Sequence, residues 1–339
     1  MNPFKIKRLV SGGIITNYFC TSRCGHCLYN AGPYRKKQYI DPDIGEENLR
    51  VVRRMGCTSV HIGGGEPLLR PHELGKILEI AAHVGVSIEY VETNASWFED
   101  LDSAKNILSE LRRKGLRTLL VSISPFHNEF IPFSRTRGVM EAARMAGVGV
   151  FPWTTDFISD LSQFDPERTH TLDAYEIKFG KGYLRQVLER YWVHMGGRAL
   201  ETFRPILPNR SPRQILDAHP EGCAKELSDT THFHIDLFGN YIPGLCTGLS
   251  ISTTDLDKPL SENKYPIVTT LAHSGIRGIG ELAQKELGYV PIRNGYINKC
   301  DLCMEIRSFL VDHKFGGESE LNPKEFYSSS HPNPDISRP

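Results

Sequence analysis

The sequence lacks a long apolar run, a secretory leader and an excess of charge of one sign. No apolar stretch approaches the roughly 20 residues that a membrane-spanning helix needs. The opening residues, MNPFKIKRLVSGG, have no long apolar region of the signal-peptide kind. Lys and Arg number 40, as do Asp and Glu, so no overall basic field attracts nucleic acid or an anionic membrane. We expect a cytoplasmic protein that binds neither a membrane nor a nucleic acid.

The pattern of apolar residues indicates the fold class. Short β-branched and aliphatic runs alternate with stretches in which apolar residues recur at helical spacing. Strand–helix repeats of this kind predict a parallel sheet covered by helices, which is an α/β fold. Glycines stand at the ends of the helical stretches, where a left-handed residue commonly ends a helix. The predicted strands are 14–19, 59–62, 87–92, 118–123 and 149–153.

A sixth unit and a domain boundary follow these five strands. A helix near 183–192 and a strand near 196–202 would complete the sixth unit, and six units are too few for a closed eight-stranded barrel. The proline-rich run RPILPNRSP then interrupts the pattern, as a linker would. The chain length suits one large domain with a smaller appendage, or two domains. The predicted parts are a barrel domain at 1–203, an extension at 204–327 and a disordered tail at 328–339.

The extension is less regular than the first part. Residues 231–243 alternate in polarity around Gly239 and Asn240, which predicts a β-hairpin. We expect a helix at 281–287 and a last helix that begins just after Cys303. The extension is therefore predicted to be a small α+β unit.

Three of the eight cysteines are packed into one short run. Cys20, Cys24 and Cys27 form a C-x3-C-x2-C spacing on the loop after the first predicted strand, and no fourth cysteine is near. Three thiolates hold three corners of a [4Fe–4S] cube, so one iron would keep a free coordination position. Zinc sites more often use paired C-x2-C elements with four ligands. The spacing alone leaves a zinc site or a chance triplet open.

This run resembles the signature of the radical S-adenosylmethionine (radical SAM) enzymes, CxxxCxxC with an aromatic residue or histidine before the last cysteine. His26 fills that position. The sequence GGGEP follows the second predicted strand, where α/β barrels place ligands and glycines permit close backbone approach. It resembles the family's GGE motif, which binds the amino group of SAM. The resemblance implies a partial (β/α)6 barrel, a three-cysteine [4Fe–4S] cluster, and SAM bound by Gly64, Gly65 and Glu66.

The same resemblance implies further SAM contacts at the ends of the later strands. Asn94 ends the third strand in VETNAS, which is similar to the family's TNG ending. Ser122 and Ser124 end the fourth strand, where the family places polar contacts to the ribose or the carboxylate. Arg135 lies where a cation toward the SAM carboxylate is common. For Ser122, packing within the strand is an equal alternative.

Polar side chains at the expected barrel mouth are further candidates. His127 lies on a loop at the mouth and titrates near neutrality, so it is our candidate for an acid–base or substrate-binding group. A solvent-exposed loop histidine is the alternative. Glu89 and Glu92 alternate with apolar residues on the third strand. One of them is a candidate to point into the barrel, and a solvated or capping role is an equal alternative.

Four further cysteines lie in the extension, at Cys223, Cys246, Cys300 and Cys303. Four thiolates complete a [4Fe–4S] set. The arrangement, with a hairpin between the first two and C-x2-C near a helix, resembles the auxiliary-cluster extensions of the twitch and SPASM type. It departs from full SPASM, which has seven cysteines and two clusters. A structural zinc site on the same four cysteines is the main alternative.

One cysteine and three histidines lie outside these two cysteine sets. Cys57 is expected to be a buried small hydrophobe at a helix end. Replacement ligands for the second cluster would be His219, His232 or His234.

The resemblance implies an activity but leaves the substrate open. A reduced cluster would cleave SAM, and the resulting 5′-deoxyadenosyl radical would abstract hydrogen, with electrons from a flavodoxin- or ferredoxin-type reductant and an auxiliary cluster relaying one electron. We expect oxidative modification or bond formation on a peptide or protein side chain. Only about a dozen residues precede the first strand, which is too few for an N-terminal peptide-binding module, so a peptide would need another docking surface or a carrier protein. A sugar, nucleotide or cofactor precursor is the alternative substrate. A non-catalytic Fe–S protein or a zinc-stabilised binding protein is a remote one.

Overall fold

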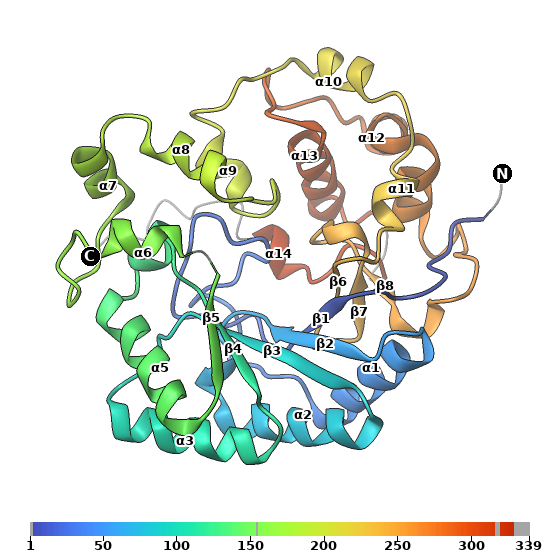
Figure 1. The fold of residues 1–339 in the computed structure, drawn as a ribbon. Coiled ribbons are helices and arrows are strands. Elements are labelled where there is room, and N and C mark those ends of the chain that lie inside the picture. The colour runs from blue at the N-terminus through green and yellow to red at the C-terminus, as the bar shows by residue number, and fades with distance from the viewer. Residues whose placement is uncertain (1–2, 154, 316–318, 329–339) are drawn as a thin grey trace.

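A single mixed sheet forms the centre of the molecule. The computed structural model describes residues 3–153, 155–315 and 319–328 (Figure 1). The strands follow the order β5-β4-β3-β2-β1-β6-β7-β8, and the sheet is open, with β5 and β8 at its edges. The α/β fold class predicted from the sequence is confirmed. The strands are β1 (Gly12–Ile15), β2 (Ser59–Gly63), β3 (Ser87–Thr93), β4 (Thr118–Val121), β5 (Gly149–Pro152), β6 (Phe233–Ile235), β7 (Asn240–Ile242) and β8 (Ile251–Ser252).

Strands β1 to β5 are parallel and are joined by helices that cover one face of the sheet (Figure 1). Helices α2 and α5 end at Gly85 and Gly147, whose φ angles of 77° and 68° are left-handed, as the sequence predicted. The elements between these strands are α1 (Pro42–Arg54), η1 (Pro67–Leu69), α2 (Pro71–Val84), α3 (Leu101–Arg113), α4 (Pro125–Asn128) and α5 (Phe133–Ala146).

The sixth predicted strand, near 196–202, is wrong. Most of that segment lies in helix α9 (Ala199–Phe203), in which Ala199, Leu200 and Phe203 are buried. The apolar residues face one side of a helix there, and among the described residues no further strand pairs with β5, which stays an edge of the sheet. Strand β6 pairs with the other end of the parallel set, at β1. The helix predicted near 183–192 is confirmed as α8. The helices before α9 are α6 (Asp156–Leu161), α7 (Leu172–Phe179) and α8 (Tyr183–Arg190).

The predicted hairpin is confirmed and joins the extension to the central sheet. Strands β6 and β7 pair antiparallel, and β6 pairs parallel with β1, so that Gly13 lies opposite His234. The sheet therefore runs without a break across the predicted boundary at residue 204, and the division into domains stays a prediction. The first residue of the predicted tail at 328–339, Ser328, ends helix α14 (Glu325–Ser328), and the rest of that segment lies outside the described residues.

Two long helices pack together in the extension. The helix predicted at 281–287 is the last part of α12, which is kinked at Gly275. The helix predicted to begin just after Cys303 begins at Lys299, before Cys300, because Asn298 caps its first turn. The extension contains α10 (Pro212–Ala218), α11 (Ala224–Leu227), η2 (Pro243–Leu245), η3 (Thr253–Asp255), α12 (Pro266–Leu287), α13 (Lys299–Asp312) and α14 (Glu325–Ser328).

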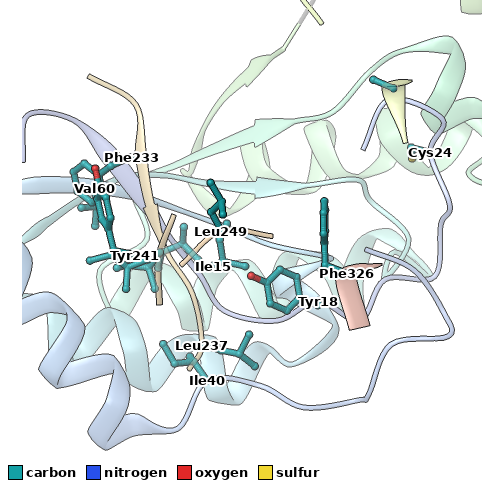
Figure 2. Close-up of a cluster of buried hydrophobic side chains, with 14 of the residues drawn as sticks. Ile15, Tyr18, Cys24, Ile40, Val60, Phe233, Leu237, Tyr241, Leu249 and Phe326 are labelled. Atoms are coloured by element: carbon teal, nitrogen blue, oxygen red, sulfur yellow. The ribbon is translucent and has the colours of Figure 1, made fainter. Parts of the chain in front are cut away.

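The buried core joins the first strands to the hairpin. Figure 2 shows Val60, Phe233 and Tyr241 together, and all three are fully buried. Burial of apolar side chains from both parts of the chain holds β1 and β6 side by side. This packing fixes the position of the strand ends on which the site is built. Among the described residues, no helix has the length and apolar character to cross a membrane.

Candidate functional site

A cavity of about 430 Å³ opens at the carboxyl ends of the parallel strands. This is the edge at which open α/β sheets bind ligands. Its wall includes all three cysteines of the first run, the two glycines after β2, and polar side chains that follow β3 and β4. The predicted site residues that line it are Cys20, Cys24, Cys27, Gly64, Gly65, Asn94, Ser122 and His127.

The three cysteine thiols converge on this cavity. Cys20 and Cys24 are buried and Cys27 is partly buried, and all three are free. Burial raises the pKa of Cys20 to about 12 and that of Cys24 well above its usual value, and the neighbouring thiols add to both shifts. Thiols in such surroundings are protonated unless a cationic group binds them. A donor set of three converging sulfurs fits three corners of an iron–sulfur cube.

Arg198 holds the cysteine loop from a distant part of the chain. Its Nε donates to the Cys24 carbonyl oxygen over 2.9 Å, and its Nη2 donates to the Ala31 carbonyl oxygen over 2.7 Å. Its backbone N–H donates to the Cys27 carbonyl oxygen over 3.1 Å. Sequence reasoning missed this residue, and the only local signal was the Gly196-Gly197 pair before it, where a Cβ atom at Gly197 would lie 2.5 Å from the same Cys27 oxygen.

The GGGEP motif packs against the backbone that leads into the cysteine loop. The Gly65 N–H donates to the Asn17 carbonyl oxygen over 2.8 Å, and the Glu66 N–H donates to the Phe19 carbonyl oxygen over 3.2 Å. A Cβ atom at Gly65 would lie 2.0 Å from the Phe19 oxygen. The motif therefore needs glycine for close approach of two backbones, as the sequence analysis argued.

Glu66 lies behind the cavity wall. It is fully buried, and its carboxyl oxygens accept hydrogen bonds from the Leu68 N–H, the Thr93 hydroxyl and the Asn94 N–H. Burial raises the pKa of Glu66 to about 7, although these three donors oppose the shift. The side chain thus ties the second strand's loop to the end of β3. A contact between Glu66 and SAM stays a prediction.

Asn94 connects this wall to the cysteines. Its Nδ2 donates to Cys20 Sγ over 3.2 Å, while its Oδ1 accepts from the Ser96 N–H over 2.9 Å. Ser122 lines the cavity nearby. Arg135 is exposed and donates to the Ser96 carbonyl oxygen over 3.0 Å, so the structure does not bring it into the cavity wall.

His26 and His127 meet on one side of the cavity. The His26 ring lies 4.6 Å from the Phe126 ring and 4.9 Å from the His127 ring. The ring that precedes the last cysteine of the run therefore packs against two other rings. Ser124 is buried, and its hydroxyl lies 2.7 Å from His127 Nδ1, so this predicted contact residue orients His127 instead of lining the cavity. Burial lowers the pKa of His127 to about 4, which makes it a neutral imidazole at neutral pH.

Of the two glutamates on β3, Glu92 faces the cavity. Burial and the charge of Glu66 raise the pKa of Glu92 to about 7. Glu89 is exposed and accepts a hydrogen bond from the Ser59 hydroxyl. Glu89 and Glu92 are three residues apart, so strand alternation places them on opposite faces, and a register shift between β2 and β3 lies beside them. Glu92 is therefore the acidic group available to a bound ligand.

The four extension cysteines also converge. Burial raises the pKa of Cys223 to about 12 and that of Cys300 to about 11, and the other thiols of the set contribute to each shift. Cys246 is shifted in the same direction by burial and by Cys300, Cys303 and Cys223. Leu245 lines the main cavity, so Cys246 directly follows a residue of the cavity wall in the chain.

The alternative ligands lie elsewhere. His232 and His234 line the main cavity. His219 ends α10. Cys57 is buried after α1, and its Sγ donates to the Ser59 carbonyl oxygen over 3.0 Å, as expected for a structural thiol.

Comparison with known proteins identifies the class. Residues 14–160 match the radical SAM superfamily, so this part of the chain is a radical SAM domain, and the family implies a [4Fe–4S] cluster and SAM. The converging thiols of the first run fit such a cluster. The match ends before the four extension cysteines and does not reach them.

Among curated proteins, the chain is similar to GTP 3′,8-cyclases. It is 32% identical over 133 residues to the enzyme of Hydrogenovibrio crunogenus, which covers 38% of each chain. It is 30% identical over 116 residues to that of Aquifex aeolicus, which covers 32% of this chain and 33% of the relative. The similarity thus spans less than two fifths of either relative. Among solved structures, native anSMEcpe with bound AdoMet aligns over 90% of this chain and 98% of its own at 12% identity and a TM-score of 0.44.

Proposed function

We propose that this chain is a radical SAM enzyme that acts on a small molecule bound in the cavity. The observation that carries the proposal is the enclosure of the three cysteines in a cavity of about 430 Å³, a size typical of small-molecule sites. When bound, the cluster and SAM supply a 5′-deoxyadenosyl radical that abstracts hydrogen from the substrate. The small-molecule alternative is thereby preferred to the peptide substrate that the sequence analysis favoured.

Different residues of the chain would bind the cluster and SAM. Cys20, Cys24 and Cys27 would hold the cluster. The backbone after β2 at Gly64 and Gly65, with Ser122 after β4, would bind and orient SAM. Asn94 would donate its amide hydrogen bond to a cluster thiolate. Each of these residues lines the same cavity, which supports this division.

A second group of residues would contact the substrate. Glu92 can accept hydrogen bonds from substrate hydroxyl or amino groups, and it can hold a proton near neutral pH because burial places its pKa at about 7. His127 is neutral and is oriented by Ser124, so it would accept or donate a hydrogen bond without adding charge. Both are partly buried in the cavity wall, where such contacts are stronger than in bulk solvent.

A nucleotide is the substrate class that we propose first. The curated relatives are named GTP 3′,8-cyclases. The cavity of this chain is lined by aromatic rings on which a base can stack, at an expected gain of about 1–3 kcal/mol per base. These rings belong to Tyr29, Tyr90, Phe151, Trp153, Tyr191 and Trp192. A cyclisation within one small molecule would be the net reaction, in place of a maturase-type oxidation of a side chain.

The second cysteine set supports an auxiliary [4Fe–4S] cluster at Cys223, Cys246, Cys300 and Cys303. Arg307 and Lys299 lie close enough to these thiols to lower their pKa values against the effect of burial. Cationic neighbours stabilise thiolates and the negative charge of a cysteine-ligated cluster. Cys246 directly follows Leu245 of the cavity wall, so a cluster held there would transfer one electron to or from the cavity. A flavodoxin- or ferredoxin-type protein would supply the initial electron.

Deuterium transfer tests the substrate class directly. The anaerobically reconstituted protein is reduced with dithionite and given SAM with GTP, with other nucleotides, or with a mixture of unstructured peptides. We expect a nucleotide to stimulate release of 5′-deoxyadenosine, and a nucleotide deuterated on its ribose to transfer deuterium into that product. Stimulation by peptides alone would refute the small-molecule proposal. The absence of any SAM cleavage in protein with its full iron content would refute the enzyme class.

A further inference from the structure

Three histidines from two parts of the chain meet beside the cavity. His61 lies on β2, His234 lies on β6, and His232 directly precedes β6. One ring nitrogen from each lies within 4.8 Å of the other two. His61 and His234 are buried, whereas His232 is exposed, so the group has one open side. His232 and His234 both line the cavity.

Two of these histidines meet because Gly13, which lies between them in the sheet, has no side chain. Gly13 on β1 pairs in register with His61 on one side and with His234 on the other. A Cβ atom at Gly13 would lie 2.4 Å from His61 Nε2, so any larger residue would push that imidazole away. The gap lets the two rings meet across β1, with their Nε2 atoms 3.0 Å apart.

Each of the two buried rings has a second hydrogen-bond partner. The hydroxyl of Tyr29 lies 2.8 Å from His234 Nδ1, and the His61 ring hydrogen bonds to the backbone of Gly12. Metal-binding histidines characteristically use their second nitrogen in this way, which fixes the ring's orientation and tautomer. His234 is thus held by its Nδ1 atom with its Nε2 atom toward His61.

The charge state suits metal ligation. Burial lowers the pKa of His61 to about 3 and that of His234 well below its usual value, so both rings are neutral at neutral pH. Neutral imidazole is the form that binds metals. Two nitrogens bound to one tetrahedral zinc ion at about 2.0–2.1 Å lie about 3.3 Å apart, which is close to the separation of the two Nε2 atoms.

We infer that His61, His232 and His234 form a binding site for one divalent transition-metal ion of the Zn²⁺ or Fe²⁺ type. Three protein ligands with an open side are typical of metal sites that bind a further molecule. Glu92 Oε1 lies 3.9 Å from His61 Nε2, within reach of the same ion. The ion would hold an oxygen of the substrate, and it could orient that substrate toward the SAM side of the cavity.

The role of the ion rests on the proposed function, but the binding of the ion does not. The test therefore measures metal and not turnover. Full-length protein with reconstituted clusters is incubated anaerobically with Zn²⁺ and desalted, and its zinc and iron are then counted by mass spectrometry. Zinc-edge X-ray absorption reports whether the bound zinc has nitrogen and oxygen neighbours or sulfur neighbours. SAM cleavage is measured separately, so a failure of the metal-site inference can be told apart from a failure of the proposed radical SAM activity.

We expect the wild-type protein to retain about one zinc per chain in nitrogen and oxygen coordination. His234→Gln and His61→Gln should lose it, and His127→Gln should keep it, because that histidine lines the same cavity outside the cluster. His232→Ala changes an exposed side chain and should weaken zinc retention at least tenfold without loss of iron. Unchanged retention in both His232→Ala and His234→Gln, or sulfur coordination, would overturn the inference. So would a wild-type protein that retains no zinc.

Discussion

Arg198 Nε donates a hydrogen bond to the carbonyl oxygen of Cys24 across 174 residues of sequence, over 2.9 Å. The same guanidinium binds the Ala31 carbonyl oxygen, so the residue that precedes α9 holds the cysteine loop in shape. A cluster site needs its ligands pre-placed, because a misplaced thiolate cannot reach its iron. The loop that carries the family's signature thus depends on a residue beyond the matched domain.

Replacement of Arg198 should loosen this loop. Arg198→Lys keeps the charge but cannot form the forked set of hydrogen bonds. We expect a loss of about 2 kcal/mol in the free energy of unfolding. We also expect lower iron retention at the first cluster, measured by iron titration after desalting. Arg185→Lys, on the exposed face of α8, is the matched control and should retain wild-type iron. Equal iron in both variants would contradict the role of Arg198.

The hydrogen bond from Asn94 Nδ2 to Cys20 Sγ should tune the first cluster. Hydrogen bonds to cluster sulfurs stabilise the reduced state and raise the reduction potential. Asn94→Ala should therefore make the potential of the first cluster more negative, in an anaerobic titration followed by electron paramagnetic resonance. Ser96→Ala, beside it in the same loop, leaves that hydrogen bond in place and should not shift the potential. An unchanged potential in Asn94→Ala would show that the amide does not reach the bound cluster.

Gly65 should tolerate no side chain. A Cβ atom there meets the Phe19 carbonyl oxygen at 2.0 Å, so Gly65→Ala must separate the GGGEP loop from the cysteine loop. We expect a destabilisation of about 1–3 kcal/mol, measured by thermal unfolding, with reduced SAM binding. Gly280→Ala is the control, because its nearest neighbour in space is Ile306 Cδ1 at 3.7 Å and alanine favours a helix. Wild-type SAM affinity in Gly65→Ala would count against the close approach.

Iron content should separate the two cysteine sets. With two [4Fe–4S] clusters the reconstituted protein holds about eight irons, and Cys246→Ala should reduce this to about four with the first cluster intact. Cys57→Ser is the matched control, since this buried thiol contacts only backbone carbonyl oxygens among the hydrogen bonds described, and it should keep about eight. A wild-type value near four irons, with one zinc on sulfur ligands, would replace the second cluster by a structural zinc site.

Glu320 should make stability depend on pH. It is fully buried, and burial raises its pKa to about 7 from an ordinary 4.5, against hydrogen bonds from the Ile267 and Val268 N–H groups at the start of α12. Between these values the unfolded chain releases a proton that the folded protein keeps. The free energy of unfolding therefore falls as the pH rises from about 4.5 to about 7, by up to about 3 kcal/mol.

The Glu320→Gln variant isolates this contribution. Its side chain does not titrate, so its melting temperature should fall less than that of the wild type between pH 5.5 and pH 7.5. Glu262→Gln, at an exposed position, should follow the wild type. Parallel curves for wild type and Glu320→Gln would show that Glu320 stays ionised in the fold.

Local patterns in the sequence predicted much of the site. The cysteine spacing and the glycines after β2 need only a few consecutive residues, and the strand–helix period placed both on the loops at one edge of the sheet. Helix ends at glycine followed for the same reason, since they depend on the φ angle of a single residue. The strand predicted at 196–202 failed because its few apolar residues fit either period, and packing on the cysteine loop decided for a helix.

Other features depended on contacts between distant residues. The orientation of Glu92 into the cavity and of Glu66 behind its wall followed from the register of β2 against β3, which neither residue's own neighbours reveal. His61 and His234 are 173 residues apart, and they meet only because Gly13 lies between them in the sheet. The sequence by itself determined which residues could bind iron and SAM, since spacing is local. Tertiary structure decided which side chains face them, since strand pairing joins segments that the chain keeps far apart.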